Sequence, residues 1–433
     1  MVGVAYRTFG RVLNVCSNQC SNISSFCSRH KKVILVVSVV IVLSLNYILQ
    51  GYLASDSFNR VLQYIGIGEC RPYVMPRKEY SFKPEEGPGF RWEGDREFWK
   101  HFPCARDTYR VVLPDGAEDA GDIFGAPKSS GGKATGTPSS TPIETCRSTV
   151  VTAIFDIGRE KWSTYSRSMK EYLGNAKIVT SMTNKMVIFT SPDLVDYFVA
   201  ERRSHGLMDR TMIIGMDVYC IPYAWLLEPV TRIMCSTEFT RGAAYLEIPE
   251  RQQPFYNIIM YAKTLFLQAA STLPFKSVNS SYYTWLDLGC HTPMCTDSNR
   301  GQCMDPSPWT RDDRIRIGMT TPMSQNLWAL DDVSWAKKHP VVFAGTIFGT
   351  SKKGAAQLAD TFWDALSTLM AQGYVCYDQS IFALAYRRWP ERFDLFHVFF
   401  DQWDHLVTDF SRKTLPPGPV NSEWKLKTFS SQG

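Results

Sequence analysis

Residues 149–190, TVVTAIFDIGREKWSTYSRSMKEYLGNAKIVTSMTNKMVIFT, contain two short apolar segments separated by a helical pattern. The segments 149–155 and 185–190 are rich in β-branched residues and short enough to be buried strands. Between them, residues 163–173 place apolar side chains at helical spacing, namely Tyr165, Met169, Tyr172 and Leu173. A strand, a helix and a second strand predict a βαβ unit, which is the building block of a parallel sheet.

The same alternation continues toward the C-terminus. Ser191-Pro192 is typical of a helix start, with Ser191 as N-cap and Pro192 at the first helical position. Further strands are predicted at residues 210–216, 282–288 and 341–343, and further helices at residues 257–270, 354–370 and 379–386. The pattern predicts an α/β domain with a mostly parallel, Rossmann-like sheet flanked by helices.

An uncharged apolar run at residues 33–49 lies close to the N-terminus. It is about the minimum length of a helix that crosses a bilayer core of roughly 30 Å. The 32 residues before it contain five basic and no acidic residues, whereas the rest of the chain carries 42 of each. This asymmetry predicts a signal anchor with a cytosolic tail and a lumenal C-terminal body. A cleaved signal peptide is the first alternative, although the run starts late and is long for one. A buried core helix is the second, which the basic flanks disfavour.

Composition divides the chain further. Residues 115–142 are dominated by Gly, Ser, Thr, Pro and Ala and hold almost no large apolar side chain, so they cannot bury a core. Part of residues 50–112 is aromatic enough to pack. We therefore expect a tail (1–32), an anchor (33–49), a partly disordered stem (50–147), a folded domain (148–412) and a C-terminal tail (413–433). An anchor, a stem and a lumenal domain are the layout of many Golgi enzymes.

Twelve cysteines fit this predicted topology. Three of them lie in the predicted tail, namely Cys16, Cys20 and Cys27. They are either palmitoylation sites beside the membrane or free thiols. Nine lie beyond the anchor, where an oxidising lumen would pair several, and an odd number leaves at least one free or intermolecular. Three of these cysteines lie close together in the sequence, namely Cys290, Cys295 and Cys303. Such a group could bind zinc, but an oxidising lumen favours disulfides. Asn279-Ser280-Ser281 is a glycosylation sequon on the predicted lumenal side.

Polar residues follow several predicted strands, at the edge where open α/β sheets bind ligands. These residues are Asp156, Gly158 and Arg159 after the first strand, Asp287 and Gly289 at the end of strand 282–288, Gly345, Thr346 and Gly349 after the next, and Asp378 with Gln379 before a late helix. A carboxylate at the end of a buried strand needs a metal, a cation or a hydrogen-bonding ligand. Asp287 is the best candidate for such a role, and the alternative is that it caps the turn after its strand.

Four motifs, in this order, resemble the HtrL/YibB-like proteins of bacteria: VVTAIFDIGREKWSTYSRSMKEYL at 150–173, MVIFT at 186–190, PFYNIIMYAKTLFLQAA at 254–270 and TWLDLG at 284–289. The resemblance covers roughly residues 148–405. That family is associated with lipopolysaccharide-core gene clusters and resembles nucleotide-sugar glycosyltransferases of the GT-A type. The resemblance therefore implies a GT-A-like fold and sugar transfer from a nucleotide-sugar donor.

On the donor side, the resemblance implies that Asp156, Gly158 and Arg159 begin the nucleotide pocket. Lys263 would face the donor from the helix before strand 282–288, unless it is simply a solvated lysine. GT-A enzymes usually hold Mn²⁺ or Mg²⁺ on an Asp-x-Asp motif, whereas this chain has Asp287-Leu288-Gly289 and lacks the second carboxylate. Metal dependence therefore stays open, with Asp287 as the candidate ligand.

On the acceptor side, the segment 345–349 resembles the glycine-containing loop that lines the acceptor. Asp378 and Gln379 resemble the late acidic motif, whose carboxylate is a general base or an acceptor contact. His397 and His405 come where some GT-A enzymes supply a last metal ligand, although a lone histidine is more often structural.

These observations predict a glycosyltransferase of the Golgi or endoplasmic reticulum membrane that moves a sugar from a nucleotide sugar to a glycan or glycoconjugate. The bilayer would be bound through residues 33–49, and the balanced charge beyond them gives no basic footprint for nucleic acid. A non-catalytic glycan-binding or scaffold protein on the same fold is the main alternative, which the single carboxylate at Asp287 keeps open. A surface receptor or adhesion protein with a stalk is the second.

Overall fold

The computed structural model describes residues 100, 102–104, 108–116, 146–162, 165–241, 248–288, 303–304, 313–321 and 323–397. All of them belong to one compact unit, Cys70–Gly433. The predicted tail, anchor and C-terminal tail, most of the predicted stem, Gly289 and His405 lie outside the described residues. Among the helices that are described, none is long and apolar enough to cross a membrane.

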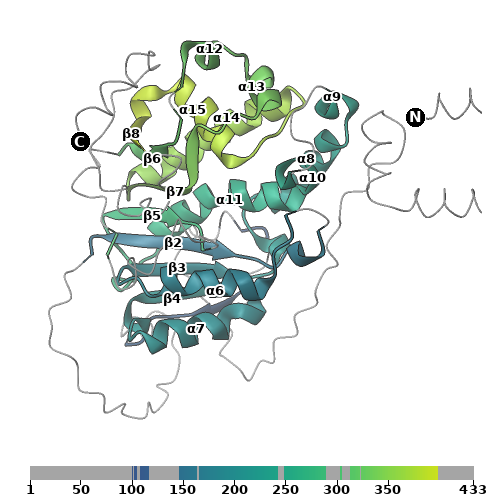
Figure 1. Cartoon of the computed structure of the whole chain (residues 1–433). Helices are drawn as coiled ribbons and strands as arrows, with labels where there is room; N and C mark the ends of the chain where they lie inside the picture. Colours follow the sequence, from purple (N-terminus) through teal and green to yellow (C-terminus); the bar gives the residue numbers. More distant parts are fainter. Residues whose placement is uncertain are drawn as a thin grey trace, which may run out of the picture. The chain divides into compact units, whose positions relative to one another are not determined.

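The described strands form one mixed sheet in the order β1-β4-β3-β2-β5-β7-β6-β8 (Figure 1). Their bounds are β1 Arg110–Val112, β2 Ser148–Ile154, β3 Lys185–Thr190, β4 Thr211–Gly215, β5 Tyr282–Leu286, β6 Ile315–Met319, β7 Phe343–Ser351 and β8 Phe393–His397. β2 to β5 run parallel and β6 pairs in parallel with β8, whereas β1 and β7 run antiparallel to their neighbours. The carboxyl ends of the other six described strands therefore meet at one edge, as a mostly parallel α/β sheet requires.

Helices cover both faces of this sheet. The described α-helices are α6 Met169–Thr180, α7 Val195–Ser204, α8 Leu227–Met234, α9 Thr237–Thr240, α10 Pro249–Gln252, α11 Pro254–Ser271, α12 Gln325–Trp328, α13 Asp332–Lys338, α14 Gly354–Ala371 and α15 Asp378–Arg388. Alternate residues of β2 enter two different cores, because side chains alternate along a strand. Val150 and Ile154 pack with residues of α6 and α7, whereas Val151 packs in the core of α11, α14 and α15.

Most of the predicted elements are present within a few residues of their predicted bounds, but two predictions were wrong. The helix predicted over residues 163–173 begins only at Met169, because the Ser168 side chain accepts a hydrogen bond from the Glu171 backbone N–H and caps the helix there. Residues 345–349 are not a loop but part of β7, which pairs with β5 on one side and β6 on the other. Strands β6, β8 and β1 were not predicted.

Disulfides and β1 tie upstream residues to the domain. Cys104 is bonded to Cys220 and Cys146 to Cys303, while Cys235 is also disulfide-bonded. Cys376 is a buried free thiol. These bonds confirm that several of the nine cysteines pair. β1, which lies in the segment predicted as stem, pairs antiparallel with β4, so the sheet extends upstream of residue 148.

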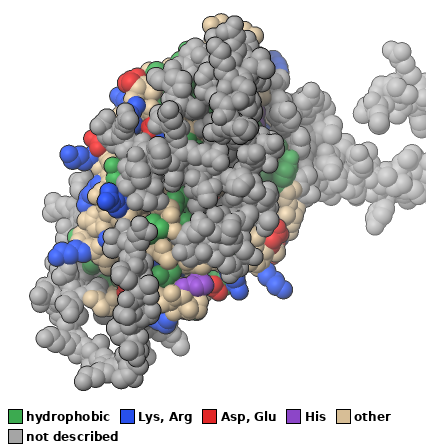
Figure 2. All heavy atoms as spheres, turned by 60° about the vertical axis from the view of Figure 1, so that its left-hand side comes forward, with side chains coloured by type: hydrophobic (Ala, Val, Ile, Leu, Met, Phe, Trp, Pro, Cys, Tyr) green, Lys and Arg blue, Asp and Glu red, His purple; other side chains and the backbone are tan. Residues whose placement is uncertain are grey.

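Charged side chains of both signs are spread over the described surface. On the face shown in Figure 2, the visible Lys and Arg side chains do not merge into one large patch, and Asp and Glu side chains lie among them. The exposed large apolar side chains of the described residues are Tyr165, Trp225 and Val341. Scattered exposed apolar residues of this kind are normal for a folded domain.

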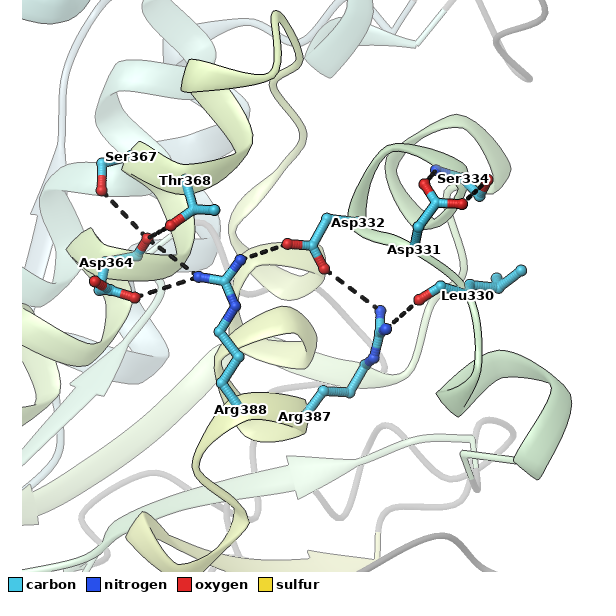
Figure 3. Close-up of polar contacts among 9 residues, drawn as sticks. All are labelled: Leu330, Asp331, Asp332, Ser334, Asp364, Ser367, Thr368, Arg387 and Arg388. Atoms are coloured by element: carbon cyan, nitrogen blue, oxygen red, sulfur yellow. Dashed lines mark hydrogen bonds and ion pairs between the residues drawn. The ribbon is translucent and has the colours of Figure 1, made fainter.

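An ion-pair network holds the C-terminal end of α15 (Figure 3). Asp332 at the start of α13 accepts a hydrogen bond from Arg388 and lies 3.8 Å from a guanidinium nitrogen of Arg387. Arg388 also donates to the Asp364 carboxylate of α14 at 3.2 Å, and Arg387 donates to the Leu330 carbonyl. The network therefore fixes the helix whose first residue is Asp378.

We predict that Asp332→Ala lowers the free energy of unfolding by about 1–2 kcal/mol, because it removes the shared partner of two arginines from a site where its side chain is only 18% exposed. Asp364→Ala is the matched control, since the Asp364 side chain is 55% exposed and should cost about 0.5 kcal/mol. Urea denaturation measures both. Equal losses in the two variants would contradict this assignment.

Candidate active site

A cavity of about 280 Å³ opens at the carboxyl edge of the sheet, beside β2 and β5. Its lining comes from the segment after β2, the first turn of α6, one face of α11 and the end of β5, with Thr346 of β7. The charged residues of the lining are Asp156, Arg159, Glu160, Arg167, Lys263 and Asp287. Four of the residues predicted for donor binding therefore surround one cavity.

Lys263 of α11 is the central polar group of this site. Its side chain is only 2% exposed, and its ammonium donates to Asp378 Oδ2 at 2.7 Å and to the Gly345 carbonyl at 3.1 Å. The two carboxylate oxygens of Asp287 lie 2.9 and 3.1 Å from the same nitrogen. A lysine ammonium has three protons, so these three acceptors use its whole donor capacity.

Burial and charge act in opposite directions on this cluster. Burial alone would lower the pKa of Lys263, but the Asp287 and Asp378 carboxylates outweigh it and raise that pKa above its ordinary value. Burial raises the pKa of Asp378, Lys263 opposes the rise, and the charge of Asp287 adds to it. Lys263 is therefore attracted by two carboxylates, whereas the attraction of Asp378 to its one cation does not offset the effect of burial on the pKa of Asp378.

Asp287 is the carboxylate that the cavity exposes. Trp285 Nε1 donates to Asp287 Oδ1 at 2.6 Å, and the Asp287 backbone N–H donates to the Thr346 carbonyl at 2.9 Å. Its side chain is 29% exposed, whereas that of Asp378 is 5% exposed and is not part of the cavity lining. Asp378, predicted as a base or an acceptor contact, is therefore buried behind Lys263.

Gly345 allows α15 to approach β7 closely. A Cβ atom at this position would lie 2.7 Å from Asp378 Oδ2 and 2.9 Å from Gln379 Cγ, closer than side chains pack. The Gln379 backbone N–H donates to Asp378 Oδ1 at 2.9 Å, so Gln379 helps to orient that carboxylate. Gly349 pairs with β5 and β6 within the sheet and is not part of the cavity lining.

A tight turn after β2 brings Arg159 to the cavity. Gly158 has a φ of 70°, a left-handed conformation that glycine adopts readily, and its N–H donates to Asp156 Oδ1 at 2.9 Å. Asp156 therefore stabilises the turn, and it also lines the cavity. The short 3-10 helix Arg159–Lys161 follows directly.

Aromatic rings surround the Arg159 guanidinium. Its central carbon lies 5.4 Å from the ring centre of Trp162, 5.7 Å from that of Tyr172 and 5.6 Å from that of Tyr256. Arg159 also donates to the Tyr165 carbonyl at 2.9 Å and to the Tyr172 hydroxyl. These contacts hold a charged, partly exposed guanidinium in one place.

Sequence reasoning missed several lining residues. Trp285 lies two residues before Asp287 and so shares its face of the strand, a spacing that could have revealed it. Tyr256 and Met260 lie seven and three residues before the predicted Lys263 on α11, a helical spacing that places them on the same face, and both line the cavity. Arg167 carried no such signal, because it precedes α6. His397 ends β8, three strands from β5, and its side chain lies outside the described part of the chain.

Comparison with known proteins identifies the family. The profile of a family described as a bacterial protein of unknown function, HtrL_YibB, matches residues 146–411. The chain belongs to the HtrL/YibB family. It is 25% identical to the protein HtrL of Escherichia coli strain K12 over 281 residues, which span 62% of this chain and 93% of that protein.

One solved structure with a limited similarity is the apo form of mouse xyloside xylosyltransferase 1. The TM-score is 0.33 and the sequence identity 11%, over 61% of this chain and 93% of that one. A similarity of this size carries no argument about the site, so the chemistry below rests on the residues of this chain.

We predict that Gly345→Ala lowers the free energy of unfolding by about 1–3 kcal/mol, because the added methyl group displaces Asp378 and α15. Gly174→Ala is the matched control: it lies within α6, its Cβ would meet nothing within 4 Å, and it should gain about 0.5–1 kcal/mol. Chemical denaturation compares them. Tolerance of both alanines would show that the close approach does not constrain the site.

His339 lies beside the site and makes the free energy of unfolding depend on pH. It stacks on Tyr377, the residue before Asp378, at 3.9 Å between ring centres and has a φ of 53°. Burial, aided by the nearby charge of Arg251, lowers the pKa of His339 from 6.5 to about 3. Between these values the unfolded chain binds more protons than the folded protein, so stability falls as pH decreases through this window.

We predict that His339→Asn removes this part of the pH dependence, about 1 kcal/mol per pH unit between pH 6 and pH 4. Asparagine tolerates the left-handed backbone at this position, so the fold should persist. Urea denaturation of both proteins at several pH values measures the difference. Identical slopes for wild type and variant would show that His339 titrates normally.

Proposed function

We propose that this protein is a glycosyltransferase that moves a sugar from a nucleotide-sugar donor to a glycan acceptor. The observation that carries the proposal is that Arg159, Arg167 and Asp287 line one cavity together with aromatic rings. A nucleotide sugar needs these three features: cations for its diphosphate, rings for its base and a carboxylate near the reacting sugar. The volume, about 280 Å³, lies just below the range of roughly 300–1,000 Å³ that is usual for small-molecule sites.

The charge distribution of the lining orients the donor. The cations that a diphosphate could contact are Arg159 and Arg167, beside which the lining also carries the Asp156 and Glu160 carboxylates, and the sugar would then extend toward Asp287. In the transfer, the bond between the sugar carbon and the phosphate oxygen breaks while the acceptor oxygen bonds to that carbon. The acceptor proton passes to a base, for which Asp287 is the exposed carboxylate of the cluster. The charge that develops on the leaving diphosphate is stabilised by the two guanidinium groups.

We also propose that the protein works in the secretory pathway, as a type II protein of the Golgi or endoplasmic reticulum membrane. The apolar run 33–49 with its basic flank supports the anchor and its orientation. The disulfides Cys104–Cys220 and Cys146–Cys303 support an oxidising compartment, because such bonds are rare in the cytosol.

A non-catalytic glycan-binding or scaffold protein is the second candidate. The observation that favours it is the burial of Asp378 behind Lys263, which leaves one carboxylate of the cluster open to the cavity. Such a protein would bind a nucleotide or a glycan in the same cavity without turnover. Donor hydrolysis therefore separates the two functions, whereas binding alone does not.

We predict that one of the uridine, guanosine or cytidine diphosphates raises the melting temperature of the full-length protein, since a ligand that binds only the folded state stabilises it. Arg159→Gln should lose this shift. Asp287→Asn should keep it but lower hydrolysis of the matching nucleotide sugar at least about 100-fold, as expected for loss of a general base. Asp360→Asn, on the exposed side of α14, is the matched control and should change neither reading.

Absence of a shift with every nucleotide would contradict the donor site. A shift without any hydrolysis in the presence of acceptor glycans would favour the binding protein.

A further inference from the structure

The GT-A resemblance implies a divalent metal ion, and the oxygen atoms around Lys263 are of the kind that would hold one. Two carboxylates and a backbone carbonyl, from Asp287, Asp378 and Gly345, converge on one point from three different elements. Carboxylate and carbonyl oxygens are the usual ligands of Mg²⁺ and Mn²⁺. In this protein the point on which they converge is the Lys263 ammonium nitrogen.

The ammonium leaves no place for a metal ion between these oxygens. Asp378 is buried with its Oδ2 on Lys263 and its Oδ1 on the Gln379 N–H, so it offers nothing to the cavity. The Asp287 carboxylate accepts hydrogen bonds from both the Lys263 ammonium and Trp285 Nε1. A metal ion next to Asp287 would therefore be repelled by the positive charge of Lys263. Among the described residues, no group of three or more His, Cys, Asp or Glu side chains is placed to hold a metal ion.

The surroundings of Lys263 also require that a positive charge stays between the two carboxylates at all times. It stands on α11, a helix whose other described side chains around it are mostly apolar and buried, and its removal would leave two carboxylates facing each other without a cation. An unpaired buried charge is costly, so the cluster needs one cation at all times. Lysine supplies that cation covalently, whereas a metal ion would have to be taken up from solution.

We propose that the Lys263 ammonium occupies the place of the divalent metal, so that this protein binds its nucleotide diphosphate without a metal ion. The proposal rests on the transferase function only for the identity of the ligand. The diphosphate is then neutralised by Arg159 and Arg167, which line the same cavity, and Lys263 acts as a positioning residue that holds Asp287.

The test measures Mn²⁺ binding and nucleotide binding separately. Electron paramagnetic resonance of free Mn²⁺ should show no specific binding to the full-length wild-type protein. Lys263→Ala should gain a site at least tenfold tighter than any in wild type, because Asp287, Asp378 and the Gly345 carbonyl then face the vacated space. That site should disappear in the double variant Lys263→Ala with Asp287→Asn. Lys338→Ala, an exposed lysine on α13, is the matched control and should behave as wild type.

The nucleotide arm uses the diphosphate that stabilises the protein, with its dissociation constant measured in EDTA and in Mn²⁺. We expect the two values to agree within twofold. A wild-type Mn²⁺ site lost in Asp287→Asn, or tenfold tighter nucleotide binding with Mn²⁺, would overturn the proposal, and neither result needs Lys263→Ala to fold. Failure of every nucleotide to bind would count against the transferase alone, because the Mn²⁺ measurement still decides the role of Lys263.

Discussion

The Lys263 ammonium donates to acceptors on three different parts of the fold: Asp287 at the end of β5, Gly345 in β7 and Asp378 at the start of α15. Because the ammonium is buried, the loss of any of these contacts would cost free energy. The surrounding residues are placed so that all three contacts form. Gly345 lacks a side chain where Asp378 approaches, and the arginines at the far end of α15 fix that helix against α13 and α14.

The same contacts fix where Asp287 lies in the cavity. The carboxylate of Asp287, held by Lys263 and Trp285, lies on the side of β5, whereas Arg159 and Arg167 come from the segment after β2. Asp156 and Glu160 also line the cavity on the side of Arg159, so an anion would have to bind through the two guanidinium groups themselves. This grouping of guanidinium groups, aromatic rings and the Asp287 carboxylate, rather than any similarity to a solved structure, is the basis on which we propose a nucleotide-sugar reaction.

Much of the fold could be predicted from the sequence, because buried parallel strands such as β2, β3 and β4 are continuous apolar runs of ordinary length. β6 was missed because its sequence, IRIGM, contains Arg316, whose charge is paired with Asp394 of β8 across the sheet. The segment 345–349 was misread because it resembles the glycine-containing loop that lines the acceptor in GT-A enzymes. The convergence of Asp156, Arg159 and Asp287 followed from the edge rule for α/β sheets, whereas Lys263 was expected only from the family resemblance. The pairing of Lys263 with Asp378 could not be predicted, since it depends on how α15 packs against β7.

We propose that a lysine ammonium, rather than a metal ion, organises a nucleotide site at this edge of the sheet. A crystal structure of the full-length protein with a nucleoside diphosphate and Mn²⁺ tests it most directly. We expect the phosphates to lie beside Arg159 and Arg167, with Lys263 still between Asp287 and Asp378 and no anomalous signal of manganese there. Manganese bridging the phosphates to Asp287, or a nucleotide bound outside the cavity, would contradict it.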